Sequence, residues 1–317
     1  MCTAISDKSL CHIFGRTLDL EYSLGEAVVI TPRRYPLGFL HSGRSDNHFA
    51  LIGAAHLVGG LPLYYDAANE HGLCAAALSF PRFAEYRKPE SGRRSLASFE
   101  LIPWVLSQAR SADEARRLLA DVTVTDESFS DELPATPLHW IFSDAERSIV
   151  LESTHRGVKI EDCKAGVLAN SPDLEAQLGN LERYARLIGS GDPIPDLHSR
   201  GLEDFGIPGD FSSGSRFVRA VYLKARTAPP KSREEAVSRF FHIMDSVSQP
   251  SGATRAEDGT PVRTVYTSAI DSERREYFFT TYENRRIRRV RLDTPSADGS
   301  ELAVFPMHTA EEVGILN

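Results

Sequence analysis

The chain of 317 residues carries 36 Lys and Arg against 44 Asp and Glu, a formal net charge of -8, and 41% of it is hydrophobic. This composition is that of a globular protein, and its acidic balance argues against a nucleic-acid-binding surface. No stretch approaches the roughly 18 apolar residues of a membrane helix, and residues 1–25 lack the basic and apolar regions of a signal peptide.

The first half of the chain is predicted to be mostly β-structure. Cys2–Ser6 and Cys11–Gly15 flank a polar turn, which predicts a hairpin. Such a hairpin would bring Arg16 and Asp19 back toward Cys2. Further strands are expected at Glu26–Thr31, Phe49–His56 and Leu73–Phe80.

Helices are expected next, followed by strands, helices and strands again. Apolar residues recur at helical spacing over Phe99–Gln108, and Ser111 with Glu114 forms a capping box before Ala115–Leu119. The later helices are expected at Leu174–Leu187, Ser215–Arg226 and Ser232–Val247, with a surface loop at Asp192–Pro208. The later strands are expected at Leu138–Phe142, Ser148–Glu152, Val158–Glu161, Gly166–Ala169, Val262–Ile270, Glu276–Tyr282, Arg286–Leu292 and Glu301–Phe305. This order favours antiparallel sheets covered by helices, with the N-terminal strand among the inner ones, over a doubly wound parallel sheet.

The cysteines indicate a reducing compartment and one candidate nucleophile. Cys2, Cys11, Cys74 and Cys163 lie far apart without a CxxC pair, which predicts neither a zinc site nor a disulfide framework and favours the cytoplasm. Removal of Met1 would give Cys2 a free α-amine beside its thiol. An α-amine of pKa ~7.7–8.0 can accept the proton of a thiol that titrates near ~8.5. Taken alone, a Cys after Met is more simply a small residue that permits removal of Met.

Four other residues are candidates for the same site. An Arg beside a thiol stabilises the thiolate and a carboxylate orients an amine, so Arg16 and Asp19 could serve Cys2, or could form an ordinary ion pair. Asn170 closes an apolar strand and could donate to an oxyanion, or could simply precede a turn. Arg216 lies in the first turn of a predicted helix, where a cation is disfavoured; it either meets an anion or active site or points into solvent.

Two other patterns favour structural roles. The arginine-rich run 285–291 is interpreted as a solvated edge strand or an intersubunit contact rather than a nucleic-acid patch. His71, His139 and His242 lack metal-ligand spacing, and we expect neither a metal nor an organic cofactor.

Eight stretches, taken in chain order, match a known pattern. They are Met1-Cys2-Thr3, residues 14–23 (from Phe14-Gly15-Arg16 to Leu20-Glu21-Tyr22-Ser23), Asn69-Glu70-His71-Gly72-Leu73, Leu138-His139-Trp140, Asn170-Ser171-Pro172, residues 206–211, Ser215-Arg216-Phe217 and Tyr282-Glu283-Asn284. Through them the chain resembles the choloylglycine hydrolase family, the N-terminal-nucleophile hydrolases that include bile salt hydrolases and penicillin V acylases. The resemblance spans nearly the whole chain. It implies an α+β fold, an αββα sandwich of two antiparallel sheets flanked by helices, as a single domain over residues 1–317 with Cys2 N-terminal after removal of Met1.

The resemblance also implies residue roles. Cys2 matches the nucleophile, Arg16 and Asp19 match the residues that support it, Asn170 matches the oxyanion-hole amide, and Arg216 matches the arginine near the thiol.

One catalytic position departs from the family pattern. Where bile salt hydrolases carry Asn and penicillin V acylases often carry Tyr, this chain has Ser79, whose backbone N–H can still donate to an oxyanion. Leu18, Phe80 and Ile141 are our candidates for the lining of an apolar acyl pocket. The loop Leu187–Pro208 is shorter than the family's loop that helps to hold a tetramer, which bears on oligomeric state.

The activity implied by the resemblance is hydrolysis of the amide bond of glycine- or taurine-conjugated bile salts, without a cofactor, by a cytoplasmic homo-oligomer (tetramer or dimer). Ser79 keeps a second activity open: a penicillin V acylase, or an acylase for other apolar-acyl amides. A non-catalytic binding protein on the same fold is the third hypothesis, and it predicts damage in the site.

Overall fold

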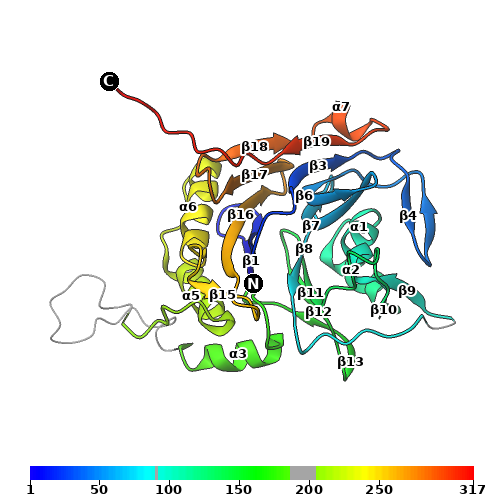
Figure 1. Ribbon diagram of the computed structural model, residues 1–317, viewed down its shortest axis with the longest axis horizontal. Coiled ribbons are helices and arrows are strands. Elements are labelled where there is room, and N and C mark those ends of the chain that lie inside the picture. Colours follow the sequence, from blue (N-terminus) through cyan, green and yellow to red (C-terminus); the bar gives the residue numbers. More distant parts are fainter. Residues whose placement is uncertain (90–91, 186–204) are drawn as a thin grey trace.

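The computed structural model describes residues 1–89, 92–185 and 205–317. Two sheets face each other in the middle of the molecule, and helices cover their outer faces (Figure 1). Helices α5 (Ser213–Arg226) and α6 (Arg233–Asp245) lie against one sheet, and α1 (Leu101–Leu106) and α2 (Ala112–Leu119) lie against the other. The predicted αββα sandwich is therefore confirmed.

The first sheet contains the N-terminal strand. Its strands, in spatial order, are β14 (Val167–Leu168), β1 (Cys2–Asp7), β2 (Ile13–Leu20), β16 (Pro261–Asp271), β17 (Glu276–Thr281) and β18 (Arg288–Arg291), with β15 (Thr254–Arg255) paired to β16. Every neighbouring pair is antiparallel. The first strand has a neighbour on each side, so the inner position predicted for it is confirmed.

The second sheet packs against the first. Its strands, in spatial order, are β13 (Gly157–Asp162), β12 (Ser148–Thr154), β11 (Leu138–Ser143), β8 (Cys74–Ser79), β7 (Leu61–Asn69), β6 (Leu51–Val58), β3 (Ala27–Thr31) and β19 (Ala303–Pro306). These pairs are antiparallel as well. Smaller elements complete the fold: the hairpin β4 (Leu37–Phe39) and β5 (Gly43–Ser45), the parallel pair β9 (Arg94–Ala97) and β10 (Val122–Thr125), the 3-10 turn η1 (Ser98–Glu100), α3 (Leu174–Glu182) and α7 (Thr294–Ala297).

Most of the predicted elements are present, with β7 the main omission. β6 and β7 form a hairpin through Gly59 and Gly60, whose φ angles of 57° and 84° suit a two-residue turn. That Gly-Gly pair was the available signal for β7. The helix expected at Leu174–Leu187 ends earlier, at Glu182, with Arg183 as its C-cap. The expected loop Asp192–Pro208 and the shorter loop Leu187–Pro208 fall largely on residues 186–204, outside the described residues.

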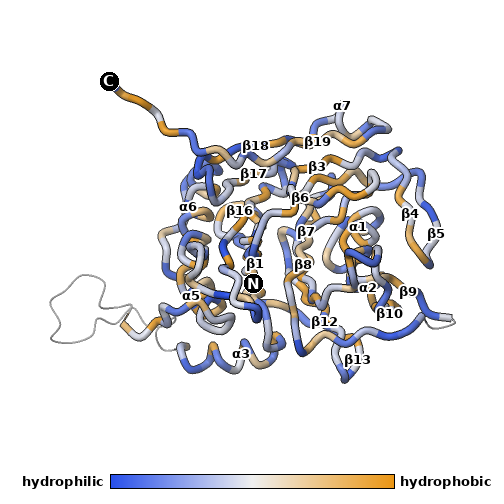
Figure 2. Tube along the Cα trace, viewed as in Figure 1, coloured by the Kyte–Doolittle hydropathy of each residue, from blue (hydrophilic) through white to orange (hydrophobic). Residues whose placement is uncertain are grey.

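The first strand, β1, is packed on both of its faces. All six of its residues are buried, because the strand lies between α5 on one side and β8 of the other sheet. Two apolar cores result. One extends from α5 and α6 into the space between the two sheets, and the other lies between the second sheet and helices α1 and α2. Figure 2 shows β3 and β6 as largely hydrophobic segments of this interior. Cys2, at the head of β1, is therefore held by the packing of the whole sandwich.

The arginine run forms an edge, as predicted. β18 is the last strand of its sheet, and the guanidinium groups make ion pairs: Arg285 with Asp245, Arg286 and Arg288 with Glu312, and Arg289 and Arg291 with Glu276. These acidic partners offset the positive charge of the run.

A buried histidine makes folding stability dependent on pH. His12 contacts the hydroxyls of Ser272, Ser143 and Ser6 at 2.8, 3.1 and 3.2 Å, and burial lowers the pKa of His12 to about 3. The unfolded chain therefore binds a proton near pH 6.5 that the folded chain does not bind, so stability is lost as pH falls from about 6.5 toward 3.

We expect the His12→Gln variant to lose less free energy of unfolding than the wild type between pH 7 and pH 4.5. Urea denaturation at several pH values measures this difference. The exposed His155 provides the control, because His155→Gln should keep the wild-type slope. An unchanged pH slope in His12→Gln would contradict this assignment.

Candidate active site

The N-terminus lies at the start of β1, beside the end of β2. Cys2 pairs with Leu18 in register, and Met1 is present in front of it. The ammonium group of Met1 donates to the carbonyl of Asp19 at 2.7 Å, and the N–H of Asp19 donates to the carbonyl of Met1 at 2.9 Å. The N–H of Cys2 donates to Oδ1 of Asn170 at 2.6 Å. The structure thus shows the chain before removal of Met1, with the nitrogen of Cys2 already in a fixed contact.

Arg16 spans the gap between the two sheets. From β2 its Nη1 donates to the carbonyls of Tyr65 and Ala77 in the opposite sheet, at 3.1 and 2.5 Å, and its Nε donates to the carbonyl of Thr17 at 3.1 Å. Burial alone would lower the pKa of Arg16, but the negative charge of a Cys2 thiolate and of nearby acidic groups raises it overall. Arg16 is therefore a fixed positive charge beside Cys2.

A buried carboxylate supports Arg16 from behind. Asp66 accepts hydrogen bonds from Tyr277 at 2.8 Å, from Ser268 at 3.0 Å and from the hydroxyl of Tyr266, and the Ser268 hydroxyl in turn accepts the backbone N–H of Arg16 at 3.1 Å. Burial raises the pKa of Asp66, while Arg16 acts in the opposite direction. The sequence analysis did not single out Asp66. The sequence offered one sign of its role: Asp66 is the one acidic residue in a mostly apolar strand. An acid that is buried in such a strand usually has charged or hydrogen-bonding partners.

Asp19 is a buried carboxylate with neutral donors. Gln249 donates from Nε2 to one carboxylate oxygen at 2.8 Å and Thr264 donates to the other at 2.7 Å. Neither donor cancels the negative charge. Asp19 therefore acts electrostatically on Arg16 and Arg216, and it raises the pKa of both guanidinium groups against the effect of their burial.

Asn170 joins three parts of the site. Its Oδ1 accepts from the N–H of Cys2 at 2.6 Å and from Nη2 of Arg216 at 2.7 Å, while its Nδ2 donates to the carbonyl of Ser79 at 2.7 Å. Two donors facing one atom fix which end of the amide is the oxygen. One of the two Nδ2 hydrogens then remains for another acceptor.

The backbone of Asn170 is held by residues that the sequence analysis did not assign to the site. The carbonyl of Asn170 accepts from Nε2 of Gln177 at 3.2 Å and from the hydroxyl of Ser213 at 2.9 Å. The preceding carbonyl, of Ala169, contacts Nε2 of His139 at 2.7 Å. Only the three-dimensional structure brings α3, α5 and β11 together here.

Arg216 points into the protein. Although it lies in the first turn of α5, its side chain is fully buried, and Nη1 donates to the carbonyl of Cys2 at 2.5 Å and to the hydroxyl of Thr3. Nε donates to the carbonyl of Phe211 at 3.0 Å. Burial lowers the pKa of Arg216, while Asp19 and Cys2 counteract this effect. The solvated alternative for this arginine is thereby excluded.

Ser79 presents its backbone to the same place. On β8 the N–H of Phe80 donates to the carbonyl of Pro137 at 2.8 Å, on the side of β11. Backbone groups alternate in direction along an antiparallel strand, so the N–H and C=O of Ser79 point away from β11. The contact from Asn170 to the carbonyl of Ser79 agrees with this direction. The Ser79 N–H therefore points to the same side of β8 as the Ser79 carbonyl, which accepts from Asn170.

An apolar cavity of about 200 Å³ opens beside Arg16. Its lining residues are Leu24, His56, Leu63, Tyr64, Tyr65, Ala77, Ser98, Phe99, Ile102, Phe129, Leu133, Pro134, Thr136, Leu138 and Trp140. None of the candidate catalytic residues lines this cavity. Two of its lining residues, Tyr65 and Ala77, are those whose backbone carbonyls accept from Arg16.

The three residues expected to line a pocket lie elsewhere. Leu18 and Ile141 belong to the core between the sheets. Phe80 is buried and stacks on His139, with ring centroids 4.2 Å apart. None of the three lines the cavity beside Arg16.

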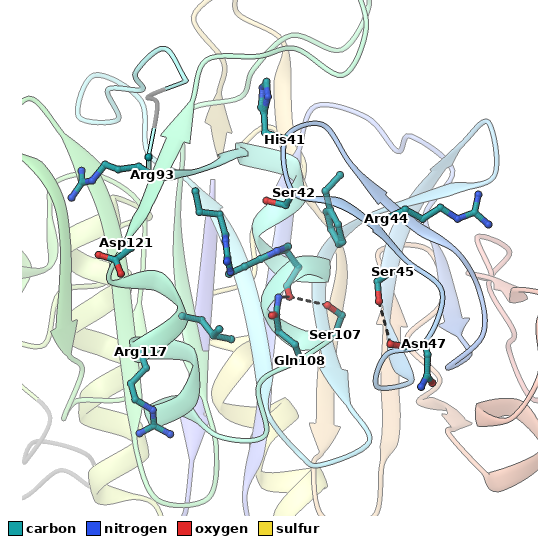
Figure 3. A pocket seen from close by; sticks show the side chains of 15 residues that line it. His41, Ser42, Arg44, Ser45, Asn47, Arg93, Ser107, Gln108, Arg117 and Asp121 are labelled. Atoms are coloured by element: carbon teal, nitrogen blue, oxygen red, sulfur yellow. Dashed lines mark hydrogen bonds between the residues drawn. The ribbon is translucent and has the colours of Figure 1, made fainter.

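A larger cavity, of about 1070 Å³, lies between the β4–β5 hairpin and helices α1 and α2 (Figure 3). It contains none of the candidate catalytic residues. In Figure 3 the side chains of Arg44 and Arg117 extend away from the centre of the group, so they do not converge on one ligand position. Size alone therefore does not identify the reactive site.

Two absences hold over the described ranges 1–89, 92–185 and 205–317. No group of three His, Cys, Asp or Glu side chains there is arranged to hold a metal ion. None of the helices in this part of the chain has the length and apolar composition needed to cross a bilayer.

The four-layer sandwich of this chain, with a cysteine at the head of an inner strand, matches the class of N-terminal-nucleophile hydrolases. The family model of linear amide C–N hydrolases, choloylglycine hydrolase family, matches residues 2–305, and the chain belongs to that family.

Several relatives are similar over their whole length. The chain is 40% identical to the bile salt hydrolase/transferase of Lactiplantibacillus plantarum and 30% identical to that of Clostridium perfringens, and each alignment covers 100% of both chains. The crystal structure of the C2A mutant of the conjugated bile acid hydrolase from Clostridium perfringens matches 100% of both chains with a TM-score of 0.90 and 28% identity. Penicillin V acylase from Agrobacterium tumefaciens shares the fold, with a TM-score of 0.77 at 20% identity over 96% of this chain and 90% of the acylase. These findings confirm the resemblance inferred from the sequence.

Proposed function

We propose that this protein hydrolyses the amide bond of glycine- or taurine-conjugated bile salts, with Cys2 as the nucleophile after removal of Met1. The observation that carries the proposal is the buried set of groups around Cys2, in which Asn170 and Arg216 hold its backbone and Arg16 supplies a positive charge. The substrate class is supported by relatives named bile salt hydrolase/transferase, one of them 40% identical over the full chain.

The reaction begins with proton transfer from the Cys2 thiol to its own α-amine. The thiolate sulfur then attacks the amide carbonyl carbon, and the carbonyl π-electrons move to oxygen. The free Nδ2 hydrogen of Asn170 and the backbone N–H of Ser79 donate to this oxyanion. The α-ammonium group returns the proton to the leaving nitrogen, which departs as glycine or taurine. Water, deprotonated by the same amine, hydrolyses the acyl-thioester and regenerates the thiol.

The surrounding charges favour the thiolate. Arg16 and Arg216 are buried cations close to Cys2, and a nearby cation stabilises a thiolate relative to the thiol. Asp19 keeps both guanidinium groups charged, and after removal of Met1 its backbone N–H is freed from the Met1 carbonyl. These residues act on the nucleophile without forming a bond to the substrate.

We assign the acyl group to the cavity between Tyr65 and Leu138 rather than to Leu18, Phe80 and Ile141. At about 200 Å³ it is smaller than the ~300–1,000 Å³ of typical small-molecule sites, so it holds part of the acyl group and its open mouth holds the rest.

Asn170→Ala should lower kcat by roughly 10²–10³-fold, the usual cost of one oxyanion-hole donor. Steady-state kinetics on glycocholate measures this loss. Asn180→Ala in the neighbouring helix α3 is the matched control and should keep wild-type kcat. A near-normal rate in Asn170→Ala would refute the oxyanion role of this residue.

The test of the proposed function is amine release from glycocholate, taurocholate and penicillin V by the purified protein, with loss of Met1 verified by intact mass. Release from the bile salts supports the proposal and shows that Ser79 is tolerated where relatives carry Asn. Release from penicillin V alone would overturn it and assign the protein to the acylase branch.

Three wider properties belong to the proposal. We place the protein in the cytoplasm, because Cys2, Cys11, Cys74 and Cys163 are free thiols. We further propose that residues 1–317 form one catalytic unit. We also propose a homo-oligomer, a dimer or a tetramer, since the apolar side chains of Val313, Ile315 and Leu316 are exposed at the C-terminus. Light scattering after size-exclusion chromatography measures the assembly state, and a monomer at micromolar concentration would contradict the oligomer.

A further inference from the structure

Both peptide groups that flank the Cα atom of Asn170 are held by side chains from other elements. The carbonyl after this atom accepts from Gln177 of α3 and from Ser213 of α5. The carbonyl before it belongs to Ala169 and contacts Nε2 of His139 on β11 at 2.7 Å. The direction of the Asn170 side chain, and with it the aim of its free Nδ2 hydrogen, therefore depends on His139 on one side.

His139 also contacts a buried acid on the neighbouring strand β12. Its Nδ1 lies 3.1 Å from Oε1 of Glu152, and the two side chains are only 0% and 4% exposed. The carbonyl of Ala169 can only accept, so Nε2 carries a hydrogen. Without a second proton between Nδ1 and Glu152, a lone pair of the imidazole would face a carboxylate inside the protein, which is costly. The two side chains therefore share one proton, and the Nε2 hydrogen stays directed at Ala169.

This pair is fixed from two further sides. Oε1 of Glu152 also accepts the N–H of Leu174, the first residue of α3, at 3.0 Å. The ring of His139 stacks on Phe80, with centroids 4.2 Å apart and ring planes at 8°. Phe80 directly follows Ser79, whose backbone N–H is the second donor assigned to the oxyanion. The imidazole thus lies against both segments that supply these donors.

We propose that His139 and Glu152 form a positioning pair that aims Nδ2 of Asn170 at the oxyanion. His139 acts through the carbonyl of Ala169, and the proton shared with Glu152 keeps the imidazole in place. This inference rests on the proposed function, and it adds two residues that act on the reaction without touching the substrate. Because the aimed donor meets charge that develops only in the transition state, loss of the pair should appear in kcat rather than in KM.

The first test compares His139→Phe with the wild type on glycocholate. This change keeps a planar ring for the stack on Phe80 but removes both ring nitrogens. We expect kcat to fall by roughly 10–100-fold, the order of loss when a catalytic group is displaced, with KM within about threefold of wild type. His139→Gln, whose amide N–H can donate to the Ala169 carbonyl, should recover most of kcat. Phe142→Leu, in the apolar core on the same strand, is the control for lost packing and should keep wild-type kcat.

A double-mutant cycle separates positioning from general damage to the fold. Where His139 acts through Asn170, His139→Phe should cost less than about threefold in kcat once Asn170→Ala has removed the amide. A loss that comes from packing alone would be the same in both backgrounds, because independent effects on the activation free energy add.

Glu152→Gln gives a further measurement that does not depend on the folding of His139→Phe. The amide has nearly the size of the carboxyl group but cannot share the proton. The imidazole could then keep both of its contacts only as a buried cation without a counter-charge, which is strongly unfavourable. We expect kcat to fall by about tenfold, again with little change in KM.

The outcomes separate this inference from the proposed function. The inference is overturned by wild-type kcat in His139→Phe or Glu152→Gln, by equal losses with and without the Asn170 amide, or by a His139→Gln variant no more active than His139→Phe. None of these results touches the proposed function, which is overturned when the wild type releases neither glycine nor taurine from the bile salts. The same cycle on penicillin V then decides the inference, because the aim of Asn170 does not depend on the acyl group. A wild type that hydrolyses none of the three substrates overturns both.

Discussion

Replacing Cys2 with Ala is expected to reduce amide hydrolysis by on the order of 10⁶-fold in kcat, the scale of loss when a hydrolase loses its nucleophile. The sulfur is the atom that bonds to the acyl carbon, and no other group around Cys2 can take its place. Arg16 and Arg216 are permanent cations, and the Asn170 amide is not nucleophilic. What remains in the variant is binding and oxyanion stabilisation alone.

Cys2→Ser tests the thiol itself, because a hydroxyl replaces the sulfur at the same position. A serine hydroxyl is scarcely ionised near neutral pH, so the two cations cannot convert it into an anion as they can a thiol. We expect Cys2→Ser to fall close to Cys2→Ala. Both variants keep a small second residue, so Met1 is removed in each and the α-amine is the same. Cys11→Ser, at the far end of the same hairpin, is the control and should keep wild-type kcat. Full activity in Cys2→Ser would contradict the nucleophile assignment.

Selective alkylation gives an independent reading of the same prediction. Burial raises the pKa of Cys11 to about 11 and also raises the pKa values of Cys74 and Cys163. Those three thiols are therefore protonated at neutral pH and react slowly with iodoacetamide. A single label at Cys2, which tracks loss of activity, is the expected mass-spectrometric result.

The fold could be predicted to the level of layers because hydrophobic runs and capping signals act locally. Ser111 accepts the N–H of Glu114 at 3.3 Å and Ser232 accepts that of Glu235 at 3.2 Å, the N-cap half of each predicted capping box. The two Glu carboxylates accept instead from the N–H groups of Arg110 and Lys231, one residue before the caps. The short strands β4, β5, β9 and β10 were not predicted, because they depend on pairing with a partner rather than on an alternating pattern of their own.

The candidate site could be predicted where the chemistry allows few residue types. It could not be predicted where the packing of distant segments decides which residues meet. A cysteine that can become N-terminal has few common roles, and the ordered family motifs supplied Arg16, Asn170 and Arg216. The cavity lined by Tyr65 and Ala77 is formed by segments far apart in the chain, so no single segment encodes it. Leu18 and Ile141, our candidates for the lining of an acyl pocket, pack between the sheets, and their contact with an acyl group stays a prediction. Asp66 reaches the site through hydrogen bonds to residues of the opposite sheet. Which residues of the two sheets face each other cannot be inferred from their order in the chain.

Retention of Met1 should reduce activity by roughly 10²–10⁴-fold, the contribution of a positioned acid–base group. With Met1 attached, the nitrogen of Cys2 is an amide whose N–H donates to Asn170 at 2.6 Å. An amide nitrogen has no basic lone pair and cannot accept the thiol proton. The amine of Met1 does not replace it, since its ammonium group is held at 2.7 Å from the Asp19 carbonyl.

The experiment inserts one Glu between Met1 and Cys2, because a bulky second residue prevents removal of Met. A second chain carries a protease site directly before Cys2, so that cleavage exposes Cys2 as the first residue. We expect the uncleaved chain to be nearly inactive and the cleaved chain to recover the wild-type rate. Recovery would show that the fold was intact throughout, and Cys2→Ala in the cleavable chain should not recover. A chain that stays fully active with Met1 in place would exclude the α-amine as the base. The thiol proton would then have to pass to water or to the substrate nitrogen, because the carboxylate of Asp19 is already occupied by Gln249 and Thr264.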